Sequence, residues 1–323
     1  MASAVSAAQV ALKYGNATLL SVETGTASAM PTDAAQNLIA VDIGNSRIKI
    51  GRFDRAQALA DQTRQPTQAA TPQLPVPLDT FDLPISNRAG EFDTARLRAW
   101  CDEHAVEPAA WLVASVHRRA AELLKATLRD VMNDLRRDDT IRQLTHLDVP
   151  LAIRVEEPPR VGIDRLLAAL AANRLRRPDR AAVVVDLGTA ITVDLLTADG
   201  AFAGGAILPG IAMSARALAE QTDALPRLML DHLEQPPAAL GTSTAPAIQA
   251  GLYWGAVGAI RELACRLSAG LSPPPDVFIT GGASPHVAEL LAAHGELLVR
   301  HVPHLVLAGI ALVDATAAGK AGG

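Results

Sequence analysis

The sequence predicts an α/β fold made from two copies of one domain, each a mixed sheet covered by helices. The segment VDIGNSRIKIG at 41–51 reads as an apolar strand, an aspartate, a glycine turn and a second strand. The segment VVVDLGTAITVDLL at 183–196 repeats that pattern, with Asp186 and Gly188 in step with Asp42 and Gly44. After each hairpin a further strand follows, and then helices alternate with strands. A shared order in both halves indicates duplication.

The first half opens with LIAVDI and RIKIGRF, two strands around a Gly-Asn turn typical of a hairpin. The stretch from Gln62 to Ser86 is rich in Gln, Thr and Pro, which predicts a long surface connection holding a short strand or two. DTARLRAWCDEH then has helical spacing, WLVASV is a short buried strand, and RRAAELLKATLRDVMNDLRR is an amphipathic helix.

The second half opens with GIDRLLAALAANRLRR, a helix that stops before Pro178. The segments AAVVVDLG, AITVDLLT and GAFAGGAIL predict three strands. We expect helices over 211–221 and 247–267, the strand DVFITGG, and a closing helix from Ser284. The domain boundaries follow: a disordered extension over 1–37, a first domain over 38–150 and a second over 151–323. The two turns with the sequence Asp-x-Gly, at 42–44 and 186–188, are called the Asp-Gly turns below. They should face one another across a cleft between the domains.

Composition excludes several classes of function. The formal charge is -5, with 29 basic and 34 acidic residues mixed along the chain, so we expect neither nucleic acid nor a membrane as partner. No segment reaches the roughly 18 apolar residues of a membrane span. Two distant cysteines support neither a disulfide framework nor a thiolate metal site, which favours the cytoplasm. A small metabolite is the expected partner.

The two turns are suited to phosphate chemistry. Glycine at 44 and 188 gives backbone freedom and lets N–H groups approach a phosphate closely. Short donors at the same rim are Asn45, Ser46 and Thr189. An aspartate before a glycine turn often only caps the turn. The repetition at matching positions favours a functional interpretation.

Charged residues strengthen this interpretation. Asp42 and Asp186 are hard oxygen ligands suited to Mg²⁺, and Lys49 places a positive charge within reach of a phosphate. In GIDR, Gly162 begins a helix and Asp164 lies in its first turn. Asp164 either caps the helix with an Arg165 ion pair or accepts the proton of a substrate hydroxyl, as a kinase requires. The glycines of FITGGAS and GGAILPG either shape a nucleotide site or form tight turns.

These elements together resemble type III pantothenate kinases, of the acetate and sugar kinase, Hsp70 and actin superfamily. The motifs are DxGNSxxK, GxDR, DxGTAxTxD, GGxIxPG, TxxxxQxG at 244–251 and ITGG, in that order from Leu38 onward. The resemblance implies two ribonuclease H-like (actin-like ATPase) domains with an interdomain cleft. It also implies transfer of phosphate from ATP, with Mg²⁺, to the primary hydroxyl of pantothenate in the first step of coenzyme A biosynthesis.

The resemblance assigns a role to each matching position. Asp164 would accept the proton, and Asp186 would bind a monovalent cation, K⁺ or NH₄⁺. The first phosphate loop would consist of Asp42, Ile43, Gly44, Asn45, Ser46, Arg47, Ile48 and Lys49, with Thr189 contacting ATP from the second turn. Pantothenate would be held by Gly162, Ile163, Asp164, Arg165 and Thr244. Members of the family are typically homodimers with active sites near the subunit interface.

The sequence departs from the family at a few positions. Ser46 replaces the usual threonine and keeps the hydroxyl, whereas Val155 stands where many members have a substrate-contacting tyrosine. Two alternatives stay open: a related kinase with another acceptor, and a regulatory protein without catalysis. A regulator would be expected to lose the catalytic constellation, yet Asp42, Lys49, Asp164 and Asp186 are all present.

Overall fold

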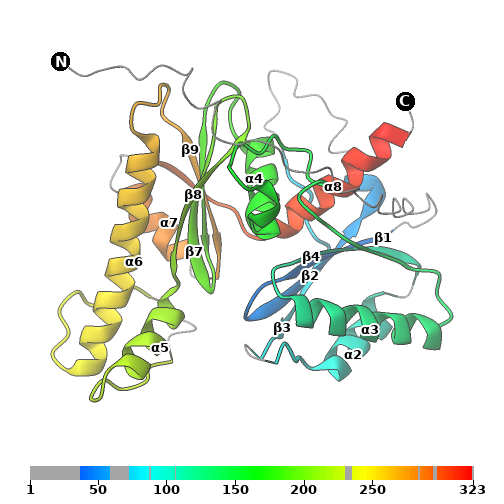
Figure 1. Cartoon of the computed structure of the whole chain (residues 1–323), viewed down its shortest axis with the longest axis horizontal. Helices are drawn as coiled ribbons and strands as arrows, with labels where there is room; N and C mark the ends of the chain where they lie inside the picture. The colour runs from blue at the N-terminus through cyan, green and yellow to red at the C-terminus, as the bar shows by residue number, and fades with distance from the viewer. Residues whose placement is uncertain are drawn as a thin grey trace, which may run out of the picture. The chain divides into compact units, whose positions relative to one another are not determined.

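The structure is a computed structural model, and it describes residues 37–58, 73–86, 89–105, 107–229, 235–282, 284–293 and 297–321. Its strands form two five-stranded sheets (Figure 1). The first contains β1 (Asn37–Ile43), β2 (Arg47–Asp54), β3 (Asp79–Pro84), β4 (Ala109–Ser115) and β5 (Thr140–Gln143). The second contains β6 (Ala182–Leu187), β7 (Ala190–Leu196), β8 (Phe202–Pro209), β9 (Asp276–Gly281) and β10 (Leu298–His301).

The two sheets have the same topology, which confirms the predicted duplication. Their orders are β3-β2-β1-β4-β5 and β8-β7-β6-β9-β10, reading the second from its other edge. In each, the first three strands in sequence pair antiparallel, and the next two add in parallel beside the first. Both sheets are therefore mixed and belong to the predicted α/β class.

Helices cover the outer faces of the sheets. The first sheet packs against α2 (Thr94–His104) and α3 (Arg118–Asp134), whose apolar faces share a core with it that includes Trp111 and Leu124. The second packs against α6 (Thr244–Ser268) and α7 (Ser284–Ala293) around residues such as Tyr253 and Ile260. Next to α6 lies α5 (Ile211–Gln221).

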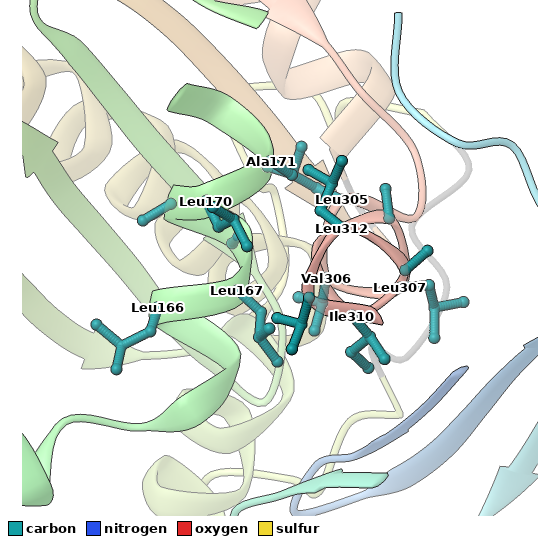
Figure 2. Close-up of a cluster of buried hydrophobic side chains, with 14 of the residues drawn as sticks. Leu166, Leu167, Leu170, Ala171, Leu305, Val306, Leu307, Ile310 and Leu312 are labelled. Carbon is teal, nitrogen blue, oxygen red and sulfur yellow. The ribbon is translucent and has the colours of Figure 1, made fainter. Parts of the chain in front are cut away.

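A third core surrounds the helices α4 (Ile163–Leu175) and α8 (Leu305–Ala321), and it includes strand residues of both sheets. Figure 2 shows Leu167 of α4 directed toward Val306 and Ile310 of α8. The helices approach closely at Gly309, where an added Cβ would lie 2.1 Å from the carbonyl oxygen of Leu167. Any larger side chain at 309 would force the two backbones apart.

The predicted closing helix from Ser284 is wrong as a single element. The structure has α7, then β10, and then α8 over that segment. Pro303 lies between β10 and α8, where a proline is tolerated because its missing N–H is not needed in either ladder of hydrogen bonds. The short edge strands β5 and β10 were not predicted, since each spans four residues that are mostly polar or exposed.

The remaining predicted elements are found close to their expected positions. Within the connection over Gln62–Ser86, β3 is one short strand, and 62–72 lies outside the described residues. The predicted extension also lies outside them, except that Asn37 begins β1. The boundary between the predicted domains stays a prediction, although α8, late in the sequence, packs against β1, β2 and β4. Across the described ranges, the helices are too short or too polar to cross a bilayer.

Candidate functional site

The two Asp-Gly turns meet in the structure, as expected from their repetition. The hydroxyl of Thr189, in the second turn, donates a hydrogen bond of 2.9 Å to the hydroxyl of Ser46, in the first. The second turn is also held by Gly210, whose N–H donates to the carbonyl oxygen of Thr189 at 3.0 Å. An added Cβ on Gly210 would lie 2.4 Å from the carbonyl oxygen of Gly188, so only glycine fits there. Gly210, the last residue of GGAILPG, therefore stabilises the second turn.

The turn glycines differ in one respect from the sequence-based expectation. Neither Gly44 nor Gly188 has a positive φ. An added Cβ would lie 3.4 Å from a backbone carbonyl oxygen in each case, that of Arg47 or that of Ala190. The expectation that both turns need a backbone conformation closed to other residues is wrong. Close approach by a ligand stays as the predicted reason for glycine at these positions.

Asp42 and Asp186 occupy matching places in the two hairpins. Asp42 lies opposite Lys49 in the β1–β2 ladder, and Asp186 lies opposite Thr192 in the β6–β7 ladder. Burial raises the pKa of Asp42 to about 7, opposed by the Lys49 charge and reinforced by Asp164 and Asp186. Burial likewise raises the pKa of Asp186 to about 6, again opposed by Lys49 and reinforced by Asp164. The three carboxyl groups thus lie close enough to repel one another.

Such a cluster fits a cation, because one would relieve the repulsion among the carboxylates. In the described part of the chain, no three side chains of His, Cys, Asp or Glu form a ready metal-binding group. Mg²⁺ does not need such a group, because it keeps several waters and takes its remaining oxygens from substrate phosphates. The donor set therefore fits a divalent ion that arrives with a nucleotide.

These pKa values predict a pH-dependent stability. A carboxyl group whose pKa rises from 3.8 unfolded to about 7 folded binds its proton more tightly in the folded state. Its contribution to the free energy of unfolding is therefore present at low pH and is lost as pH rises from 3.8 towards about 7. We expect the melting temperature to fall across this range, and Asp42→Asn to flatten the fall. An unchanged slope in Asp42→Asn would contradict the assignment.

The GIDR turn supplies the third carboxylate of this cluster, that of Asp164. Gly162 is the N-cap of α4 and Asp164 lies in the first turn of that helix, as predicted. An added Cβ on Gly162 would lie 2.5 Å from Oδ1 of Asp164, so the glycine makes room for that carboxylate. Burial raises the pKa of Asp164, opposed by the N–H of Arg165, which donates to Oδ1 at 2.8 Å. The position of the Asp164 carboxylate therefore depends on the absence of a side chain at Gly162.

The ion pair between Asp164 and Arg165, the alternative left open by the sequence, does not form. The Arg165 guanidinium instead binds Asp194 on β7, through Nε at 3.1 Å to Oδ2 and through Nη2 to Oδ1. The last aspartate of DLGTAITVD was therefore a functional candidate that sequence reasoning missed. The available signal is its place as the last residue of the motif DxGTAxTxD.

The other predicted residues are placed as follows. Val155 packs at the edge of the core around α4 and α8, so it adds no polar group at the usual tyrosine position. Thr244 begins α6 and lines a cavity of about 630 Å³ between α5 and α6. Among the described residues, no hydrogen bond joins Thr244 to Gly162–Arg165. In FITGG, Gly281 has a φ of +104° and packs against Leu187, whereas nothing lies within 4 Å of a Cβ added to Gly282.

The structure thus combines a duplicated mixed-sheet fold with two apposed Asp-Gly turns and a carboxylate in the first turn of a helix. The sequence profile of the type III pantothenate kinases matches residues 38–266. The chain is 33% identical over 256 residues to the type III pantothenate kinase of Dehalococcoides mccartyi strain BAV1, covering 79% of this chain and 88% of the relative. It is 35% identical over 281 residues to that of Rhodopirellula baltica, covering 83% and 95%.

The chain belongs to the type III pantothenate kinase family. It is accordingly a kinase, and kinases of this kind use ATP with a divalent metal. Among solved structures, an inorganic polyphosphate/ATP-glucomannokinase from an Arthrobacter strain overlaps with a TM-score of 0.42 at 16% identity, covering 87% of this chain and 99% of that one. The activator of a 2-hydroxyisocaproyl-CoA dehydratase from Clostridium difficile overlaps with a TM-score of 0.43 at 14% identity, covering 88% and 96%.

Proposed function

We propose that this chain transfers the γ-phosphate of ATP to the primary hydroxyl of pantothenate, giving 4′-phosphopantothenate, the first step of coenzyme A biosynthesis. The family supports the substrates. The observation that carries the proposal is geometric: the Thr189 hydroxyl donates to the Ser46 hydroxyl at 2.9 Å, so the two Asp-Gly turns meet. The Asp164 charge contributes to the raised pKa of Asp42 in the first turn and of Asp186 in the second, which agrees with a position near both. A proton acceptor thus lies beside both elements suited to phosphates.

The roles follow from what each group can do. The N–H groups and hydroxyls of the first turn, with Thr189 from the second, hold the phosphates of ATP, and Lys49 adds positive charge. Asp164 orients the pantothenate hydroxyl and takes its proton as the oxygen attacks the γ-phosphorus and the bond to ADP breaks. The bound Mg²⁺ supplies charge neutralisation at the phosphates. Asp164 can act from a rigid position, because its helix begins at a glycine that clears space for it.

The direct test is release of ADP by the purified chain with Mg-ATP and K⁺ or NH₄⁺, with and without pantothenate. Pantothenate-dependent release would support the proposed reaction. Release that depends on another small hydroxyl compound, and not on pantothenate, would favour a related kinase with a different acceptor. Binding of ATP without release for any acceptor would favour the regulatory alternative.

We also propose that Asp186 holds the monovalent cation, K⁺ or NH₄⁺. The raised pKa of this buried carboxyl group shows that its negative charge is poorly compensated, which a cation would correct. We expect Asp186→Ala to flatten the activation curve for K⁺ and NH₄⁺. An activation curve with the wild-type midpoint would place the cation elsewhere. Asp199→Ala, at an exposed ion pair, is the control that should leave the curve unchanged.

Homodimer formation is part of the proposal, and the surface of α6 supports it. Gly251, Gly255 and Gly258 recur along one side of α6 with nothing within 4 Å of an added Cβ. The neighbouring cavity between α5 and α6 is lined by Leu218, Leu225, Ile248 and Leu252. A second copy of this chain would cover this surface. It would then lie near Thr244, which lines the same cavity. Light scattering of the purified chain measures the mass, and a monomer would contradict the proposal.

A cytoplasmic location completes the proposal. Cys101 and Cys265 both lie outside any disulfide, which suits a reducing compartment. Fractionation of cells that express the chain would test it.

A further inference from the structure

Asp194 is a deeply buried carboxylate that the proposed reaction does not use. Its side chain is 2% exposed, and the Arg165 side chain that binds it is 14% exposed. Both Nε and Nη2 of Arg165 donate to Asp194, so the planar guanidinium is held along one edge. The face of the same guanidinium lies over the Phe202 ring, 5.5 Å from its centroid. Arg165 is therefore fixed in both position and plane.

The strand beside Asp194 is built to leave room for this pair. Gly205 of β8 is the cross-strand neighbour of Asp194. An added Cβ on Gly205 would lie 2.5 Å from Oδ1 of Asp194 and 2.2 Å from the carbonyl oxygen of Val193. Gly205, the second glycine of GGAILPG, thus makes room for the carboxylate opposite it. Three separate motifs, GxDR, DxGTAxTxD and GGxIxPG, converge on a single ion pair.

We propose that Asp194 is a positioning residue, which holds Arg165 in the orientation that receives pantothenate. The inference rests on the proposed function, because it takes from there that Arg165 contacts the substrate. Among the described residues, the hydrogen bonds to Asp194 leave Nη1 of Arg165 without a hydrogen-bond partner. Nη1 carries two donors, and fixing the other edge of the guanidinium fixes where those donors point.

Arg165 also connects this pair to the proton acceptor. Its backbone N–H donates to Oδ1 of Asp164, so the residue that Asp194 holds is bonded to the carboxylate that takes the proton. The guanidinium and the Asp164 carboxylate would contact different parts of one substrate. Loss of Asp194 should weaken substrate binding first, since the hydrogen bond between Asp164 and the Arg165 backbone does not involve the side chain.

The test compares Asp194→Asn with a matched variant, Asp276→Asn. Asp276 binds Arg177 through the same two guanidinium nitrogens, but it begins β9, at the strand end away from Gly281. In Asp194→Asn we expect KM for pantothenate to rise roughly 10-fold to 100-fold, with a smaller change in kcat and no change in KM for ATP. Asp276→Asn should leave both KM values unchanged, although it breaks a similar pair.

Arg165→Lys keeps the inference falsifiable if Asp194→Asn folds poorly, because an unchanged KM for pantothenate in Arg165→Lys would overturn it. Where both variants fold, a double-mutant cycle tests whether the two residues act together. Arg165→Lys keeps the charge but removes the planar fork. If Asp194 acts through Arg165, adding Asp194→Asn to Arg165→Lys should raise KM for pantothenate much less than Asp194→Asn does alone.

The outcomes separate the two proposals. Wild-type activity on pantothenate with an unchanged KM in Asp194→Asn, or with fully additive effects in the cycle, would overturn the positioning role and leave the proposed function standing. A wild-type chain that folds and binds ATP but does not act on pantothenate would overturn both. A selective, non-additive rise in KM for pantothenate would support both.

Discussion

We expect Asp164→Asn to lower turnover by about 10²-fold to 10⁴-fold, the usual range for a positioned general acid or base. Asparagine has nearly the same shape, so it fills the space that Gly162 leaves and still accepts the Arg165 N–H. It does not accept a proton from the substrate hydroxyl. The loss should therefore appear in kcat, and circular dichroism should show an unchanged fold.

The pH profile gives a second measurement of the same residue. Burial raises the pKa of Asp164, and only the ionised carboxylate accepts a proton. The wild-type rate should fall as pH drops through that raised pKa, and the residual rate of Asp164→Asn should lack this limb. Near-normal turnover in Asp164→Asn would remove Asp164 from the role.

A second large effect is expected far from the site. We expect Asp314→Ala to lower the free energy of unfolding by about 3–5 kcal/mol, the usual cost of removing one partner from a buried ion pair. Asp314 on α8 accepts a hydrogen bond of 2.7 Å from Nε of Arg55, and the two side chains are 3% and 8% exposed. The variant leaves the Arg55 charge buried without that carboxylate. Urea unfolding followed by circular dichroism measures the change.

Two comparisons identify the cause of that loss. Asp134→Ala removes a contact of similar length, 2.8 Å to Arg98, at an exposed pair, and should lower the free energy of unfolding far less. Replacing both partners, Arg55→Met with Asp314→Leu, should recover most of the stability, because no buried charge is left. Equal losses in Asp314→Ala and Asp134→Ala would show that burial is not the reason.

The sequence predicts the fold well where periodicity and repetition agree. The hairpins around Asp42 and Asp186 and the helix opened by Gly162 all have strong local signals, and the structure contains them. Elements without such signals were missed. β5 and β10 are short edge strands whose order depends on a neighbouring strand, and the break between α7 and α8 depends on packing.

The site was predictable only in part, for a physical reason. Single motifs identify Asp42, Asp164 and Asp186, because each aspartate lies at a turn or helix start within its own motif. The Arg165–Asp194 pair joins residues 29 positions apart, and no local pattern shows which carboxylate a guanidinium will choose. The purpose of Gly205 is similarly non-local, because it depends on the side chain across the ladder.

The position of α8 has a consequence for how the protein is made. Ribosomes release a chain from its first residue onward, so β1, β2 and β4 leave the ribosome long before α8 does. The pair Arg55–Asp314 spans 259 positions, so it closes only after that whole stretch has been made. Until then one face of the first sheet, including Leu38 and Phe53, lacks its cover and stays open to water or to chaperones. Completion of the first sheet's core therefore waits for the synthesis of α8, far along the chain from the strands that it covers.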